Sequence, residues 1–225
     1  MEKVFKFSNK SIIFSVILVL VSLTISVSIG AAEISTDEIV GIFLREILGY
    51  QSNTEINNIN KIIVLEWRLP RFCLGFLVGA SLAIAGCGFQ GVFKNPLADP
   101  FLLGSAAGAG LGVTLVIVND LNYSFGIINS VQLGAFIGAL GAVICAAFIS
   151  ISAGKSIASL LLAGIATAAF LTACQTYLMH KYYSSMQEIY SWIIGRLLTS
   201  GWEDVITILP YFTVCFIIIF LFRKE

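Results

Sequence analysis

Long apolar stretches recur along the chain and are separated by short polar segments. A helix needs about 20 predominantly apolar residues to cross the hydrocarbon of a bilayer. Stretches of about that length lie near residues 11–32, 70–91, 101–118, 131–153, 158–180 and 204–222. The pattern therefore predicts an all-α polytopic membrane protein with six transmembrane helices, in which residues 1–225 form a single transmembrane domain.

The first apolar stretch has some features of a signal peptide, because three lysines precede it and Gly30-Ala31-Ala32 ends it. Its apolar run is longer than the core of a typical signal peptide, so we interpret it as an uncleaved helix. With six spans, Lys94 and Lys155 fall on the same side as the N-terminus. Basic residues in short loops favour the cytoplasm, so we expect a cytoplasmic N-terminus.

Two polar segments have a pattern of their own. Residues 33–60 contain Thr36-Asp37-Glu38 followed by apolar residues at helical spacing, which predicts a short amphipathic helix. Residues 181–203 are rich in tyrosine and tryptophan, as is typical of side chains at a membrane interface.

Composition narrows the possible functions. The chain is 58% apolar and 12% charged, with a mean hydropathy of +0.94, and its 13 basic residues balance its 13 acidic residues. No net charge is available to attract nucleic acid. The five cysteines lie singly in apolar stretches and His180 is the only histidine. We therefore expect no metal site and no catalytic dyad.

The stretches 70–91 and 101–118 are rich in glycine, alanine and serine. Such residues let helix backbones approach closely where no hydrophobic effect drives helices together in lipid. Close packing between helices is enough to explain why these two stretches are rich in small residues. Helices built in this way are also suited to tilting against one another around a transport pathway.

Two proline-containing motifs mark helix ends. Pro96 disfavours helix at Asn95, and Asp99 followed by Pro100 is the pattern of a helix N-cap with proline in the first turn. Asp99 is also a candidate proton relay, because carboxylates near a membrane interior are often functional, but its position favours capping.

Several motifs together resemble the FecCD/BtuC family of permeases. They are Arg68-Leu69-Pro70-Arg71, the run LVGASLAIAGCGFQGVFKNPLADPFLLGSAAGAGLG from Leu77 to Gly112, SLLLAGIA at 159–166, and SWIIGRL and GWEDV between Ser191 and Val205. The resemblance extends from about residue 60 to the end. The first 60 residues match the family only in layout.

The resemblance implies a permease subunit of a binding-protein-dependent ABC importer, with a bundle of roughly ten helices per subunit. Such a permease is multi-pass in a bacterial or archaeal inner or plasma membrane, among lipid. Its expected partners are a pair of ATPase subunits, an extracytoplasmic substrate-binding protein and a second permease copy or paralogue. The permease itself would be no enzyme and bind no cofactor, since the partner uses the ATP.

Ferric siderophores are the expected cargo, and haem or cobalamin are the alternatives. An ion-coupled secondary transporter is a further alternative, although such proteins normally carry carboxylates at mid-membrane. Because the chain ends soon after the sixth stretch, we expect the C-terminal part of the family fold to be missing.

The resemblance also assigns roles by position. Arg68 and Arg71 correspond to arginines that receive glutamates of the binding protein, although composition alone favours plain interface charges. The cytoplasmic gate corresponds to Ser156, Ile157, Ala158 and Ser159. Gln90 and Gln175 are the polar side chains that we expect along the pathway, although buried glutamines more often bond between helices.

Overall fold

A computed structural model describes residues 9–49, 57–96, 98–121, 123–125, 128–195 and 197–222. The chain divides into two compact units, and helix α4 (Leu69–Phe93) contributes to both. The first unit comprises residues 1–76 and 197–205, and the second comprises residues 77–196 and 206–225. Each is described by itself.

The first unit contains two helices that are joined by a short link. They are α1 (Asn9–Ser28) and α2 (Thr36–Leu48). The Ser35 hydroxyl accepts a hydrogen bond from the backbone N–H of Glu38, and Gly49 ends α2 in the left-handed conformation with φ +67°. This confirms the amphipathic helix expected after residue 33.

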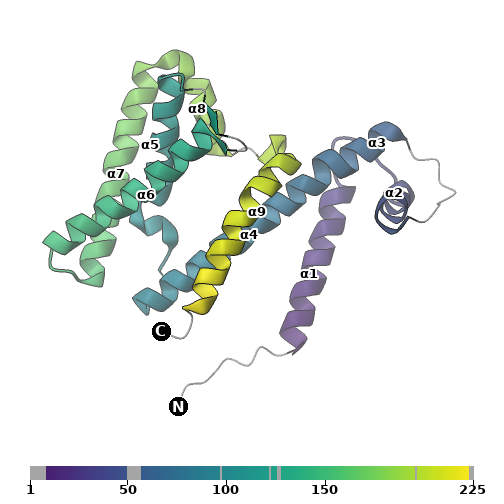
Figure 1. Cartoon of the computed structure of the whole chain (residues 1–225), viewed down its shortest axis with the longest axis horizontal. Coiled ribbons are helices and arrows are strands. Elements are labelled where there is room, and N and C mark those ends of the chain that lie inside the picture. The colour runs from purple at the N-terminus through teal and green to yellow at the C-terminus, as the bar shows by residue number, and fades with distance from the viewer. Residues whose placement is uncertain are drawn as a thin grey trace. The chain divides into compact units, whose positions relative to one another are not determined.

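Next come α3 (Asn58–Ile62) and the π-helix η1 (Ile63–Arg68), which leads directly into α4. The unit also includes the 3₁₀ turn η4 (Leu197–Thr199) and the beginning of α9 (Trp202–Leu221). The carboxylate of Glu38 ties α2 to α3, because it accepts from the backbone N–H of Asn57 and from Nδ2 of Asn60. Figure 1 labels the helices α1, α2, α3, α4 and α9.

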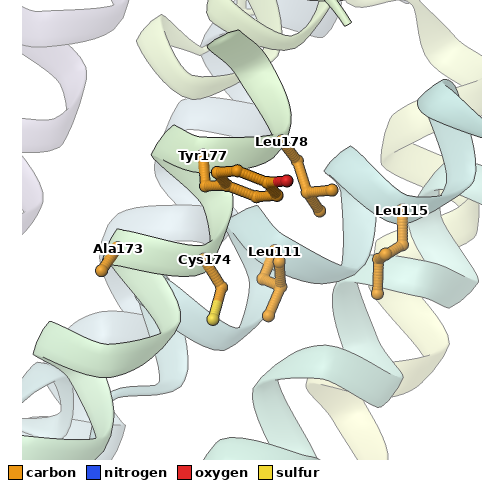
Figure 2. Close-up of a pocket in the computed structure, with 6 residues that line it drawn as sticks. All are labelled: Leu111, Leu115, Ala173, Cys174, Tyr177 and Leu178. Carbon is orange, nitrogen blue, oxygen red and sulfur yellow. The ribbon is translucent and has the colours of Figure 1, made fainter. Parts of the chain in front are cut away.

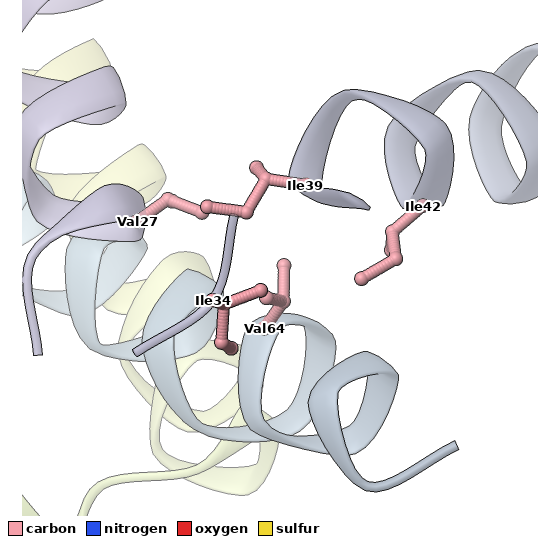
Figure 3. Packing of buried hydrophobic residues seen from close by; sticks show 5 residues of the cluster. All are labelled: Val27, Ile34, Ile39, Ile42 and Val64. Atoms are coloured by element: carbon pink, nitrogen blue, oxygen red, sulfur yellow. The ribbon is translucent and has the colours of Figure 1, made fainter. Parts of the chain in front are cut away.

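A small apolar cluster holds the first unit together. Figure 3 shows its side chains, which come from α1, α2, η1 and the link between α1 and α2. Ile42 and Val64 are fully buried in it. The apolar stripe of α2 thus packs against the end of α1 and the start of the long helix that follows. The five members are Val27, Ile34, Ile39, Ile42 and Val64.

The second unit is a helical bundle in which α5, α6 and α7 pack against one another (Figure 1). Its elements follow here in chain order. They are the rest of α4, η2 (Pro100–Leu103), α5 (Ser105–Val118), β1 (Ser124–Phe125), β2 (Ile128–Asn129), α6 (Ser130–Ser152), α7 (Ile157–Lys181), η3 (Tyr183–Ser185), α8 (Met186–Ile194) and the rest of α9. The two short strands pair antiparallel, with Ser124 opposite Asn129.

Glycines allow α5 and α6 to approach until their backbones touch. A Cβ added to Gly108 would overlap the carbonyl oxygen of Gly138, and a Cβ added to Gly112 would overlap that of Gly134. These pairs are four residues apart on each helix, so they form one continuous seam. The predicted close packing of small residues is therefore confirmed for the stretch 101–118. In the stretch 70–91, a Cβ added to any of the glycines would meet no described atom within 4 Å.

Five helical segments within the described residues have the length and composition to cross a membrane. They are Asn9–Ser28, Asn58–Phe93, Ser130–Ser152, Ile157–Lys181 and Trp202–Leu221. The predicted stretch at 101–118 differs from the other five. Gly104 adopts φ +80° there and separates the 3₁₀ turn η2 from the 14-residue α5. At about 1.5 Å per residue, α5 is shorter than the hydrocarbon core.

Candidate functional site

Arg68 lies inside the first unit, at the end of η1. Its side chain is only 6% exposed. One terminal nitrogen, Nη1, donates to the carbonyl oxygens of Val27 and Ser28 at 2.5 and 3.3 Å. The other, Nη2, donates to that of Ala32 at 2.5 Å. The guanidinium therefore binds three backbone carbonyls at and beyond the C-terminus of α1.

This arrangement follows from the way in which α1 ends. The last carbonyls of a helix have no partner within the helix, and a cation is favourable beside them. Gly30 makes room for the guanidinium, because a Cβ there would lie 2.6 Å from Nη2 of Arg68. Sequence analysis predicted no such bonds, since backbone carbonyls leave no mark in the sequence. The predicted docking role of Arg68 stays a prediction.

Pro70 lies at the junction between η1 and α4 and removes one backbone donor. In the π-helical pattern each N–H bonds to the carbonyl five residues earlier, and the N–H of Leu69 bonds to the Val64 carbonyl in this way. The next donor in that pattern would come from residue 70, but proline has no N–H. The pattern thus leaves the carbonyl of Leu65 without its backbone donor.

The indole of Trp202 supplies the missing donor. Its Nε1–H donates to the carbonyl oxygen of Leu65 at 2.9 Å. The two residues are 137 positions apart in the chain. The start of α9 is therefore fastened to the π-helix at a carbonyl that would take its donor from residue 70 in the π-helical pattern.

Arg71 follows one turn of helix after Arg68 and contacts the same distant segment. Its Nε donates to the carbonyl oxygen of Leu197 at 3.1 Å, and the Ser200 hydroxyl donates to the same oxygen at 2.7 Å. Arg71, Arg68 and Trp67 also line a hollow of about 420 Å³ beside residues 29–32. The Trp67 side chain is 59% exposed. Arg71 thus lies at a partly open aromatic and cationic surface.

The predicted gate segment forms the turn between α6 and α7. Ser156 and Ser159 cap the start of α7 reciprocally, since the side chain of each accepts from the backbone N–H of the other. The hydroxyls of Ser150 and Ser159 lie 3.3 Å apart, which links the turn back to α6. Residues 154–158 are exposed, including Ile157 and Ala158. The structure describes the turn but does not test a gate.

The two glutamines that were predicted along the pathway have different environments. Gln90 is exposed on α4. Gln175 is only 8% exposed, and its amide occupies the space opposite Gly110, where a Cβ would lie 2.8 Å from it. Nε2 of Gln175 and the hydroxyl of Thr167, both buried on α7, have no hydrogen-bond partner among the described residues. The structure does not bring the two glutamines together at one site.

Close to Gln175, an apolar hollow of about 500 Å³ lies between α5 and α7. Figure 2 shows the side chains that line it. They are Leu111 and Leu115 of α5, and Ala173, Cys174, Tyr177 and Leu178 of α7. The side chains around this hollow are almost entirely hydrocarbon, so it offers an apolar surface only.

At the predicted junction, Asp99 caps the 3₁₀ turn η2. Its Oδ1 accepts from the backbone N–H of Phe101 at 2.7 Å, and Pro100 is the first residue of the turn. The backbone N–H of Asn95 bonds to the carbonyl of Gln90 at the end of α4, and Pro96 follows. The capping role predicted for Asp99 is confirmed.

Replacing Thr167 with valine tests whether its unpartnered hydroxyl matters for stability. A buried hydroxyl without a partner costs free energy, and valine has nearly the same shape. We expect Thr167→Val to leave the free energy of unfolding unchanged or to raise it by about 1 kcal/mol. Thermal unfolding of the purified protein in detergent measures this. A clear loss of stability would mean that the hydroxyl has a bound partner such as water.

The long apolar helices among the described residues, two of which pack along a glycine seam, are those of a multi-pass helical membrane protein. The chain belongs to the FecCD transport family, whose family model matches residues 18–225. This confirms the family that the sequence motifs indicated.

Individual relatives agree with the family. The Fe(3+)-citrate import system permease protein YfmE of Bacillus subtilis (strain 168) is 36% identical over 210 residues, which make up 92% of this chain and 58% of YfmE. The cobalamin import system permease protein BtuC of Halobacterium salinarum is 36% identical over 166 residues, 73% of this chain and 44% of that protein. This chain thus spans about half the length of these relatives.

A solved structure shares the fold. It is an inward-facing conformation of an ABC transporter assigned to the metal-chelate type, with a TM-score of 0.70 and 24% sequence identity. The match covers 92% of this chain and 60% of that one. The predicted fold class, an all-α BtuC-like bundle, is therefore confirmed for the part of the fold that this chain spans. Of the six predicted spans, residues 101–118 are the exception, since their helix is too short to cross a membrane.

Proposed function

We propose that this chain is part of the permease subunit of a binding-protein-dependent ABC importer. The match of the FecCD family model to residues 18–225 carries the proposal. The permease forms no covalent bond and binds no cofactor of its own. A pair of ATPase subunits hydrolyses ATP, and a second permease copy or paralogue completes the pathway.

The proposed cargo is a ferric siderophore or a similar iron chelate. The similarity to the Fe(3+)-citrate permease extends over 92% of this chain, compared with 73% for the cobalamin permease. Haem and cobalamin remain the alternatives. An ion-coupled transporter is less well supported, because the carboxylate of Asp99 caps a helical turn instead of standing alone in a span.

In the proposed orientation the N-terminus is cytoplasmic. The segment around Arg71 then faces the binding protein, and the Ser156–Ser159 turn faces the ATPase side. We assign docking to Arg71, which lines the hollow beside exposed Trp67. Glutamates of the binding protein are its proposed partners, because arginine and carboxylate form charge-assisted hydrogen bonds. Arg68 is buried beneath this surface and stabilises the backbone of residues 27–32, which lies beside it.

Transport requires that the pathway open alternately to the two sides. The seam between α5 and α6 allows this, because backbones that meet at glycines shift between discrete packings without side chains in the way. The Ser156–Ser159 turn connects α6 and α7 and would narrow the cytoplasmic end. Gln175, which is buried opposite Gly110, is the better placed of the two predicted pathway glutamines to respond to such a shift.

The proposal predicts that reversing the charge of Arg71 weakens docking. In the complete importer reconstituted in nanodiscs, Arg71→Glu should lower the affinity for the binding protein about 10-fold or more, mainly through slower association at low salt. Surface plasmon resonance at two salt concentrations measures this effect. Uptake of radiolabelled iron, presented as ferric siderophore, should fall in parallel.

Arg45→Glu is the matched control, since Arg45 is an exposed arginine near the end of α2. It should leave docking unchanged. Equal losses for both variants would indicate only a general field effect, and the docking assignment would then be wrong. Uptake that persists after the ATPase is inactivated, but stops when the ion gradient is dissipated, would refute the importer itself.

A further inference from the structure

Two hydrogen bonds fasten the segment Leu197–Trp202 to the helix that carries Arg71. The Trp202 indole donates to the carbonyl of Leu65, and Nε of Arg71 donates to the carbonyl of Leu197. Both bonds lie within the first compact unit. One bond is made before Pro70 and the other directly after it, so they flank the point where the π-helix changes into the α-helix.

We propose that Trp202 is a positioning residue for Arg71, and this inference rests on the docking role proposed for Arg71. By occupying the carbonyl that Pro70 leaves without a donor, Trp202 holds the segment in a fixed place. The carbonyl of Leu197 then lies where it orients the Arg71 guanidinium. Trp202 therefore governs docking of the binding protein without contacting it.

The segment is built to transmit this restraint. The Ser200 hydroxyl donates to the Leu197 carbonyl, which also accepts from Arg71. The backbone N–H of Gly201 donates to Oδ2 of Asp204 at 3.1 Å, which ties the start of α9. These short-range bonds limit how far residues 197–204 can move internally. The hydrogen bond between Trp202 and the Leu65 carbonyl thus restrains the position of Leu197, five residues away.

Pro70 explains why a side chain, and not a backbone N–H, donates to the carbonyl of Leu65. Had residue 70 carried an N–H, the π-helical pattern would provide a backbone donor for the Leu65 carbonyl, and an indole would not be needed. Pro70 is fully buried at this junction. In this structure the donor to the Leu65 carbonyl is the indole of Trp202.

The alternative explanation is that Trp202 matters only as a bulky aromatic ring at an interface. Phenylalanine keeps an aromatic ring but removes the N–H. Trp202→Phe therefore tests the hydrogen bond more than the ring. Pro70→Ala provides an independent way to satisfy the Leu65 carbonyl, because an alanine N–H restores the backbone donor.

The test uses the complete importer in nanodiscs and measures binding-protein affinity by surface plasmon resonance. Trp202→Phe should weaken docking about 5- to 10-fold, as expected for losing the orientation of one charged contact. Adding Pro70→Ala should not restore docking, because an alanine N–H satisfies the Leu65 carbonyl without holding residues 197–202 in place. Trp192→Phe, a tryptophan substitution in α8, is the matched control and should have no effect.

Two results would overturn the inference. One is normal docking by Trp202→Phe. The other is recovery of docking when Pro70→Ala is added, which would show that Trp202 acts only by satisfying the Leu65 carbonyl and not by holding residues 197–202 in place. In an Arg71→Gln background, Trp202→Phe should add no further loss, because both substitutions act on the same contact. Additive losses would show that Trp202 does not act through Arg71.

A second readout separates this inference from the proposed function. Amide hydrogen exchange of residues 63–72 should speed up in Trp202→Phe and slow again when Pro70→Ala is added, whether or not Arg71 docks anything. If Arg71→Gln docks normally while exchange follows this pattern, the docking function is wrong and the Trp202 tether is right. If Arg71→Gln weakens docking while exchange is unchanged by Trp202→Phe, the tether is wrong.

Discussion

Gly138→Val is expected to disrupt the packing of α5 against α6. A Cβ at residue 138 would overlap the carbonyl oxygen of Gly108, which is backbone and cannot rotate away. The two helices must separate to make room, and the contacts along the whole seam are then lost. We expect a loss of about 3 kcal/mol or more, at or above the upper end for overpacked cores. Thermal unfolding in detergent and the yield of folded protein measure the effect.

Gly141→Val provides the matched control. It makes the same change in the same helix, at a position with no described atom within 4 Å of a Cβ. Effects of helix propensity and of side-chain hydrophobicity are therefore shared by the two variants. Equal stability of Gly138→Val and Gly141→Val would contradict the seam. A large loss at both positions would mean that another surface covers Gly141.

Arg68→Met is expected to destabilise the first unit while keeping much of the side chain's apolar volume. Three carbonyl oxygens at and beyond the end of α1 lose a charged donor. Hydrogen bonds to charged groups contribute about 1.5–3 kcal/mol each and are not additive, so we expect a total loss of about 3 kcal/mol. Thermal unfolding measures the total loss of stability. Faster amide exchange in residues 25–32 would show that the loss arises at the end of α1.

Arg45→Met is the control for removing one positive charge, because Arg45 is exposed. Its stability should stay within about 0.5 kcal/mol of the unaltered protein, as for most surface substitutions. Normal stability of Arg68→Met together with lost docking would support the role in docking that the sequence motif predicted for Arg68. The two arginines of the motif would then share one role.

The sequence predicted the helices well because their signal is long and repeated. Five of the six stretches appear as helices of 20 or more residues. The exception, residues 101–118, contains Gly104, whose left-handed conformation breaks the helix. From the sequence alone, a glycine that breaks a helix looks the same as a glycine that serves helix packing. Asp99 was predictable because a cap depends on residues close in sequence.

The candidate site was only partly predictable. The motif directed attention to Arg68 and Arg71, but the partners of Arg68 are carbonyls some 40 residues away, and any residue type can provide them. The same applies to the carbonyl of Leu65, which Trp202 reaches across 137 positions. Richness in small residues predicted a seam, whereas the pairing of Gly108 with Gly138 depends on the register of two helices.

The bonds of Arg68 also have a consequence for biosynthesis. The residues that it caps, Val27, Ser28 and Ala32, leave the ribosome well before residue 68 does. During that interval the end of α1 has only water or lipid headgroups to satisfy its last carbonyls. The hydrogen bonds at the end of the first helix are therefore completed only after residue 68 has been synthesised. A ribosome that pauses before codon 68 would present the insertion machinery with an unfinished helix end.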